Sequence, residues 1–334
     1  MANLVSEVLL QTVDLVKSFP VRAGMFASRN LRLLAVDAVN FSIKKGETLG
    51  LVGESGCGKS TLALTIIKLY EPTSGAIIFE GQDIAGFSES QMRDRRREMQ
   101  MIFQDPLSSL DPRMVIEEII REPLDIHAHG SVKDRLEIVR QLLEITGLPV
   151  DSGQRFPTEF SGGQQQRIGI ARALALQPKL LICDEPVSSL DVSVQAQILN
   201  LLRDLQQQFE LTYLFISHNI AVTALMSQRI GVMYLGQLVE IGPSYNIVNL
   251  PLHPYTAALI SAVPDPETGK RVRRNALEGE VPSPIYRPAG CPFHPRCPVV
   301  QDRCRSELPK LRELAQGHLV ACHFAAIDST LLVL

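Results

Sequence analysis

Short runs of apolar residues alternate with stretches of helical spacing along this chain of 334 residues. The runs are clearest at Thr48–Val52, Lys179–Cys183 and Thr212–Ser217, and each is bounded by polar residues or glycine, as buried strands are. From Val132 to Thr146 apolar residues recur every three or four positions, which is typical of an amphipathic helix. The pattern predicts an α/β fold.

Further segments complete this expectation. AIIFEG and MQMIFQ are expected as strands, TLALTIIKLY as a helix, and RIGVMYLGQLVEIG as two strands joined by a turn. A helical insertion is expected from about residue 105 to 165, between two halves of the sheet. Prolines and glycines become frequent after Pro251, so we divide the chain into residues 1–255 and a C-terminal region, 256–334. A small cysteine-bearing module is expected within that region, after about residue 280.

Composition excludes several classes of protein. A formal net charge of -3 argues against a nucleic-acid binder, which is usually basic. No window approaches the roughly 18 apolar residues of a membrane span. The first residues lack the basic start of a signal peptide. We therefore expect a cytosolic chain that acts on a membrane only through partners.

A glycine-rich loop follows the strand at Thr48–Val52. In GESGCGKS the glycines allow backbone amides to turn toward an anion, and the next helix adds its positive N-terminal end. Lysine in this pattern reaches the β- and γ-phosphates, and the serine hydroxyl binds Mg²⁺. A plain glycine-rich turn is the alternative, disfavoured by the flanking strand and helix. The predicted nucleotide-binding residues are Gly53, Glu54, Ser55, Gly56, Cys57, Gly58, Lys59, Ser60 and Thr61.

Two adjacent carboxylates follow the buried run LLIC. Such a pair is usually solvated surface, but here Asp184 would emerge at the end of a strand and hold a metal ion. Glu185 is the candidate general base for an attacking water molecule.

The stretch FSGGQQQR, with these two motifs, resembles the ATP-binding subunits of ABC transporters. The resemblance implies a P-loop NTPase with a RecA-like core, an inserted helical subdomain and two cassettes that close head to tail on ATP. It assigns γ-phosphate contacts from the opposite subunit to the signature helix, Mg²⁺ sensing to Gln104, the dimer-crossing loop to Asp191 and a γ-phosphate switch to His218. The signature residues are Ser161, Gly162, Gly163 and Gln164.

Two of the residues named by the resemblance have ordinary alternatives. Phe19 would stack on adenine, although a core phenylalanine is an equal rival. A lone histidine such as His218 is more often structural, and its place after Asp184 in the chain is what favours the switch. Phe160 and Asn219 depart from the residues most common in the family.

Four cysteines crowd the last quarter of the chain: Cys291, Cys297, Cys304 and Cys322. In a reducing compartment such a cluster indicates metal rather than disulfides. Their spacing differs from the paired C-x₂-C spacing of zinc fingers. Four thiolates can bind a [4Fe–4S] cluster or one zinc ion, and unligated cysteines are the third alternative. His294 and His323 are spare candidate ligands.

The C-terminal region of oligopeptide/dipeptide transporter ATPases is similar to three stretches of this chain, HPYTAALISAVP, GCPFHPRCP and GHLVACH. Together with the cassette motifs, the resemblance spans about residues 8–324. It favours the iron–sulfur cluster. It also implies an ATPase on the cytoplasmic face of a bacterial inner membrane, with two permease subunits, a second and related ATPase chain, and indirectly an extracytoplasmic binding protein. Glutathione or nickel uptake, a soluble ABC protein, a P-loop kinase and an iron–sulfur sensor remain the alternatives.

Overall fold

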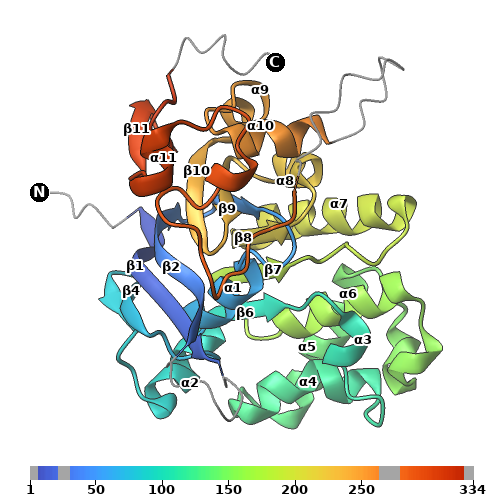
Figure 1. Ribbon diagram of the computed structural model, residues 1–334. Helices are drawn as coiled ribbons and strands as arrows, with labels where there is room; N and C mark the ends of the chain where they lie inside the picture. The colour runs from blue at the N-terminus through green and yellow to red at the C-terminus, as the bar shows by residue number, and fades with distance from the viewer. Residues whose placement is uncertain (1–6, 22–30, 263–278, 327–334) are drawn as a thin grey trace, which may run out of the picture. The chain divides into compact units, whose positions relative to one another are not determined.

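The computed structural model describes residues 7–21, 31–262 and 279–326 (Figure 1). The remaining parts of the two predicted domains, 1–6, 22–30, 263–278 and 327–334, lie outside the described residues. The chain forms two compact units. The first holds Ile43–Glu47, Gly86–Ile216 and the described end of Met1–Leu9, and the second holds the described residues of Leu10–Ser42, Thr48–Ala85 and Ser217–Leu334. The boundary near residue 255 therefore stays a prediction.

Three parallel strands form the sheet of the first unit. β7 (Leu180–Asp184) pairs with β6 (Met99–Ile102) on one side and with β8 (Thr212–Ser217) on the other. Every residue of β7 and β8 is buried, as expected of parallel strands covered on both faces. The strands expected from the apolar runs are confirmed here.

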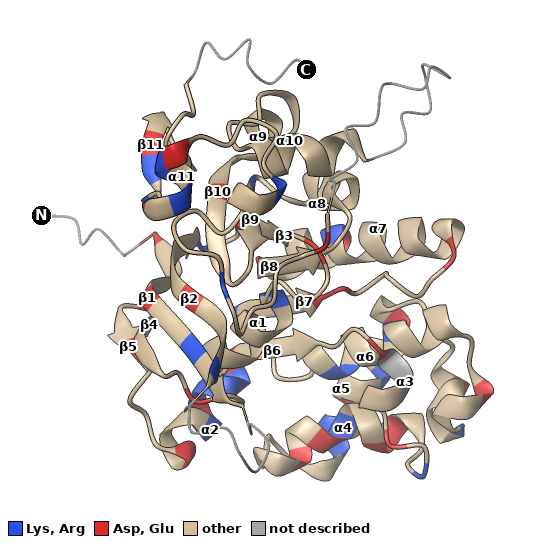
Figure 2. Cartoon of the chain, in the orientation of Figure 1, with Lys and Arg blue, Asp and Glu red and all other residues tan. Residues whose placement is uncertain are grey.

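Helices make up the rest of the first unit. In this unit α4 (Ile116–Ile126) packs against α5 (Val132–Ile145) and α6 (Gly162–Leu174). Charges of both signs cover α4 and α5 (Figure 2), and i,i+4 pairs such as Arg121–Asp125 join them along the helix. The other helical segments are α2 (Glu89–Glu98), α3 (Pro106–Ser109), η1 (Val150–Gln154), η2 (Pro157–Glu159) and α7 (Val192–Phe209).

The larger sheet of the second unit contains strands from both ends of the sequence. β3 (Thr48–Val52) pairs in parallel with β9 (Arg229–Tyr234), which pairs antiparallel with β10 (Gln237–Pro243). A C-terminal hairpin, β11 (Arg312–Ala315) and β12 (His318–Val320), continues the sheet beyond β10. The sequence pattern predicted β3, β9 and β10 but not the hairpin.

A second, antiparallel sheet in this unit has the order β2-β1-β4-β5. Only β4 (Ser74–Phe79) was expected. The two long strands β1 (Val8–Pro20) and β2 (Arg32–Lys44) were missed, and each contains a residue with positive φ, Asp14 or Ala38, where the alternation of buried and exposed side chains is interrupted. β5 (Gln82–Asp83) is a short edge.

The C-terminal cysteine-bearing segment shares a core with the larger sheet of its unit. Cys291, Phe293 and Cys304 pack in one apolar cluster with Tyr234 and Tyr255. The cysteine-bearing segment is therefore held by packing against this sheet. The helical segments of this unit are α1 (Lys59–Ile66), α8 (Ile220–Met226), α9 (Ser244–Asn249), α10 (Pro254–Ser261), η3 (His294–Arg296) and α11 (Asp302–Ser306).

None of the helices in the described part of the chain combines the length and apolar character that crossing a membrane requires.

Candidate functional site

The glycines of the phosphate loop are required by its backbone. Gly58 caps α1 with φ of 108°, and a Cβ atom there would lie 2.1 Å from the carbonyl oxygen of Ala35. Gly53 has φ of 156°, and its Cβ would lie 2.3 Å from the carbonyl oxygen of Met233. Other residues cannot adopt these positions without moving the backbone. The loop therefore takes the close turn into a helix N-terminus that anion binding requires.

Lys59 is held inside this loop. Its ammonium group donates to the carbonyl oxygens of Gly53 at 2.8 Å and Glu54 at 3.1 Å, and the residue is only 5% exposed. Burial raises the pKa of the adjacent Cys57 thiol, while Lys59 opposes the rise. Cys57 therefore remains a protonated, buried side chain rather than a reactive thiolate. Ser55 and Gly56 are exposed, and Ser60 and Thr61 are half-buried in the first turn of α1.

The carboxylate pair lies at the carboxyl end of β7. Asp184 is buried at 5% exposure, and Glu185 is half-buried with a left-handed backbone, φ 47°. A non-glycine residue rarely takes this conformation, and such left-handed non-glycine residues are enriched at functional sites. The Glu185 amide donates to the carbonyl of Ile216, which fixes the turn against β8. The carboxylate accepts a hydrogen bond from the Gln104 side chain, 3.1 Å away.

The predicted signature residues form the N-terminus of α6. Ser161 is the N-cap, and its hydroxyl accepts from the Gln164 amide, while the Gln164 side chain accepts from the Ser161 amide. This reciprocal capping box defines where the helix begins. Gly163 is packed so closely that a Cβ atom would lie 2.4 Å from Val194 of α7. Ser161, Gly162 and Gln164 are exposed, as residues that bind something outside the chain must be.

The two remaining predicted loop residues also lie at helix starts. Asp191 is the exposed N-cap of α7. The turn before it is held by Gln195, whose side-chain amide donates to the carbonyls of Val187 and Leu190. His218 is exposed directly after β8. The following Asn219 caps α8 by accepting from the amides of Ala221 and Val222, so this family departure has a structural purpose.

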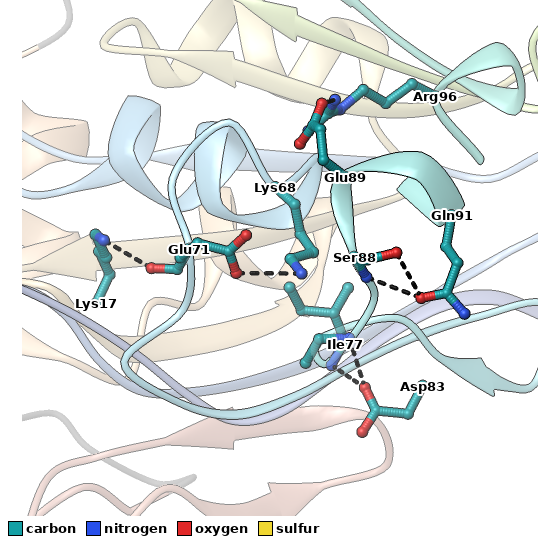
Figure 3. A network of polar contacts seen from close by, with 10 residues as sticks. Lys17, Lys68, Glu71, Ile77, Asp83, Ser88, Glu89, Gln91 and Arg96 are labelled. Carbon is teal, nitrogen blue, oxygen red and sulfur yellow. Dashed lines mark hydrogen bonds and ion pairs between the residues drawn. The ribbon is translucent and has the colours of Figure 1, made fainter. Parts of the chain in front are cut away.

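Phe19 lies within β1 and packs on other side chains. Its ring meets the ring of Tyr70 edge to face, with centroids 5.3 Å apart, and the Lys17 ammonium lies 4.8 Å above it. Lys17 also donates to the carbonyl of Glu71, whose carboxylate pairs with the buried Lys68 (Figure 3). Phe19 is half-buried, so its adenine contact stays a prediction beside the packing that the structure records.

Sequence reasoning missed two residues that contact the phosphate loop. The hydroxyl of Tyr255 accepts a hydrogen bond from the Glu54 amide at 2.9 Å. Arg296 forms a two-point ion pair with the Glu54 carboxylate, at 2.7 and 3.0 Å. The only local signals for them are the His-Pro-Tyr triplet at 253–255 and the arginine before Cys297. Their partner lies about 200 residues or more away, a pairing that no local pattern reveals.

The four C-terminal thiols lie near one another and none forms a disulfide. Burial raises the pKa of Cys291 and of Cys297 to about 11, and the neighbouring thiols add to both shifts. Among the described residues, no three His, Cys, Asp or Glu side chains are gathered closely enough to hold a metal ion. His294 contacts the carbonyl of Cys291, and His323 contacts that of Glu307, so each ring already has a structural contact.

The predicted site residues belong to two different units. Gln104, the carboxylate pair and the N-terminus of α6 belong to the first unit, and the phosphate loop and His218 belong to the second. Within each unit, the structure brings together Gln104 with Glu185, Ser161 with Gln164, and Gly53 and Glu54 with Lys59.

Comparison with known families finds two matches along this chain. Residues 36–188 match the ABC transporter family, and residues 239–304 match the oligopeptide/dipeptide transporter C-terminal region.

Similar proteins span nearly the whole chain. The oligopeptide transport ATP-binding protein AppF of Bacillus subtilis is 51% identical, with 95% of this chain and 97% of that protein covered. The probable peptide ABC transporter ATP-binding protein y4tS of Sinorhizobium fredii is 50% identical, with 96% and 91% covered. Among solved structures, the ATP-binding cassette MJ0796, a dimer bound to ADP and Pi, has a TM-score of 0.63 at 27% identity, covering 71% of this chain and 99% of that one.

Proposed function

Because the chain belongs to the ABC transporter family, as an ATP-hydrolysing subunit with an oligopeptide/dipeptide transporter C-terminal region, we propose that it powers the uptake of dipeptides or oligopeptides. The observation that carries this proposal is the likeness to peptide transport ATP-binding proteins through both regions of the chain. The cassette alone would be compatible with any cargo.

The partners follow from the role of an ATP-binding subunit. We place the chain on the cytoplasmic face of the bacterial inner membrane, bound to two permease subunits. A second, related ATPase chain would complete the pair of cassettes, and an extracytoplasmic binding protein would deliver the peptide to the permeases. The similar cassette solved as a dimer with ADP and Pi supports the paired arrangement.

The predicted catalytic and phosphate-contacting residues have distinct parts in hydrolysis. Lys59 and the amides of the phosphate loop bind the phosphates of ATP, and α6 of the partner cassette presents Ser161 and its free N-terminal amides to the γ-phosphate. Glu185 accepts a proton from the attacking water molecule, while Gln104 orients the Glu185 carboxylate. His218 contacts the γ-phosphate, and Asp191 lies at the crossing between cassettes. Positioning and charge neutralisation supply most of the catalysis.

Mg²⁺ suits the oxygen donors that the chain offers. Asp184 at the end of β7, the Ser60 hydroxyl and the Gln104 side chain are donors of the kind this ion prefers. When bound, Mg²⁺ would neutralise charge on the phosphates.

Peptide uptake by living cells tests the proposed cargo. The gene would be deleted in its source organism, and uptake of a labelled dipeptide, a labelled pentapeptide, glutathione and ⁶³Ni²⁺ would be measured. Loss of peptide uptake alone, restored by the wild-type gene, supports the proposal. Selective loss of glutathione or nickel uptake would replace it by one of those cargoes, and unchanged uptake of all four would favour a soluble ABC protein.

We further propose that Cys291, Cys297, Cys304 and Cys322 hold a [4Fe–4S] cluster, with zinc as the alternative. Support comes from four cysteines without a disulfide in a single segment, whose thiols influence one another's pKa. Their described arrangement is not a closed ligand set, so binding would draw the side chains together.

Metal content decides between these alternatives. The chain would be purified without oxygen and analysed for iron, acid-labile sulfide and zinc. About four iron and four sulfide per chain, the composition of a [4Fe–4S] cluster, support the proposal. One zinc ion would replace the cluster by a redox-silent site, and neither metal would refute both.

A further inference from the structure

Glu54 of the phosphate loop is held through three of its groups. Its amide donates to the Tyr255 hydroxyl at 2.9 Å, its carboxylate binds Arg296, and its carbonyl oxygen accepts from Lys59 at 3.1 Å. Lys59 and two side chains from the C-terminal third of the chain, Tyr255 and Arg296, thus all contact Glu54. Moving Glu54 would move an acceptor of the lysine that binds phosphate.

The pair between Arg296 and Glu54 is well shielded from water. The Arg296 side chain is 4% exposed and that of Glu54 27%, and both oxygens of the carboxylate are engaged. Two-point guanidinium–carboxylate pairs are stronger and more directional than single contacts. The pair therefore fixes the Glu54 side chain in one orientation, unlike an exposed surface pair.

The elements that carry Arg296 and Tyr255 are themselves held in a common core. Arg296 lies in η3 between Cys291 and Cys297, next to Phe293. The Phe293 ring contacts those of Tyr255 and Tyr234, with centroids 5.4 and 5.3 Å apart. A change in how Cys291 or Cys297 is held would thus reach Glu54 through one short turn.

A second arginine of the C-terminal segment supports the backbone behind the loop. Arg287 pairs with Asp37 at 2.6 Å and donates to the carbonyl of Leu34 at 2.9 Å. The neighbouring Ala35 carbonyl oxygen is the atom that a Cβ added at Gly58 would meet, at 2.1 Å. The C-terminal segment therefore contacts the loop and also the strand that the loop lies against.

From these contacts we infer that Arg296 is a positioning residue for the phosphate loop. By fixing Glu54 it sets how Lys59 and the loop amides meet the phosphates of ATP, and the cysteine-bearing segment thereby controls nucleotide affinity. Arg296, which lies outside the phosphate loop, thus contributes to the affinity for ATP. The effect concerns nucleotide binding by one chain and holds whatever the cargo of the transporter.

A double-mutant cycle tests this coupling. Binding of a fluorescent ATP analogue with Mg²⁺ would be titrated on the full chain, using wild type, Arg296→Met, Glu54→Gln and the double variant. Each single variant should weaken binding about tenfold, and the double variant should be no weaker than the singles, because both remove the same contact. Unchanged affinity in Arg296→Met, or additive losses in the double variant, would overturn the inference.

A matched variant and a conservative one separate positioning from general stability. Arg303→Met removes another arginine–glutamate pair of the same segment, but an exposed one in α11, and should leave affinity unchanged. Arg296→Lys keeps the charge without the two-point geometry and should restore part of the affinity. A loss in Arg303→Met equal to that in Arg296→Met would assign the effect to the segment as a whole and refute the specific role.

Hydrogen exchange supplies a readout that does not depend on a fully stable Arg296→Met protein. In Glu54→Gln and Arg296→Lys, the amides of residues 53–58 should exchange faster, while those of β7 keep their rate. Equal rates at residues 53–58 in wild type and both variants would contradict the inference.

Discussion

The side-chain amide of Gln104 donates a hydrogen bond to the carboxylate of Glu185, across 3.1 Å. The two residues follow neighbouring parallel strands, β6 and β7, whose carboxyl ends meet at one edge of the sheet. Gln104 is exposed and Glu185 is half-buried. A group that approaches Gln104 from outside can therefore act on the candidate general base through a single hydrogen bond.

Replacing Glu185 by glutamine should stop hydrolysis and preserve ATP binding. Glutamine has nearly the same shape but cannot accept the proton of the attacking water molecule, and loss of a general base lowers turnover by about 10²- to 10⁴-fold. Steady-state phosphate release and nucleotide titration measure the two properties. Size-exclusion chromatography with ATP and the second ATPase chain should show this variant eluting as a closed pair of cassettes.

Glu144→Gln is the matched control for that variant. Glu144 lies on the surface of α5, paired with Arg140, so the same chemical change should leave hydrolysis unchanged. Near-normal turnover in Glu185→Gln would remove Glu185 from the role of base.

Gly163→Ala should destabilise the chain, and Gly162→Ala should not. A Cβ atom at Gly163 would lie 2.4 Å from Cγ1 of Val194, whereas one at Gly162 would lie 3.4 Å from Leu190, an ordinary contact. Overpacking of this kind costs about 1–3 kcal/mol of unfolding free energy. Thermal or urea unfolding would measure it.

Val194→Ala should rescue the Gly163→Ala variant, because it removes the methyl group in the way. Equal unfolding free energies for the two glycine variants would contradict the packing described for the N-terminus of α6.

His253→Asn should make stability less dependent on pH. Burial lowers the pKa of His253 to about 4, while the Glu240 carboxylate opposes the shift. An unfolded histidine titrates near pH 6.5, so the unfolded chain binds more protons between about pH 4 and 6.5. Stability from His253 is therefore complete above pH 6.5 and is lost as the pH falls, by at most about 1.4 kcal/mol per pH unit.

Asparagine suits the test because it can keep the helix cap that His253 provides to the Tyr255 amide. His318, which pairs with the same Glu240, is present in both proteins. The slope of unfolding free energy between pH 5 and 7 should be shallower in the variant, and identical slopes would show that His253 does not titrate on unfolding.

Local sequence patterns predicted the parts of the fold in which burial follows a simple period. β3, β7 and β8 are uninterrupted apolar runs because both faces of these strands are covered, and α5 shows one apolar face. Gly53 and Gly58 could be expected from the loop motif alone. In each case the signal lies within a few residues.

The contacts to Glu54 could not be predicted in this way. Arg296 and Tyr255 reach the loop only because the C-terminal segment shares a core with Tyr234 of β9, and such packing depends on the whole fold. A single arginine between two cysteines carries no sign of its partner. The long strand β1 was missed because the irregularity at Asp14 interrupts its alternating pattern.

We propose that ATP hydrolysis at Glu185 of this chain drives peptide uptake. Phosphate release and labelled dipeptide uptake would be measured together, in membrane vesicles from the deletion strain carrying either the wild-type gene or Glu185→Gln. The wild-type gene should restore both activities, and the variant should restore neither while still binding ATP. Peptide uptake at the wild-type rate with Glu185→Gln would show that hydrolysis at Glu185 does not drive uptake.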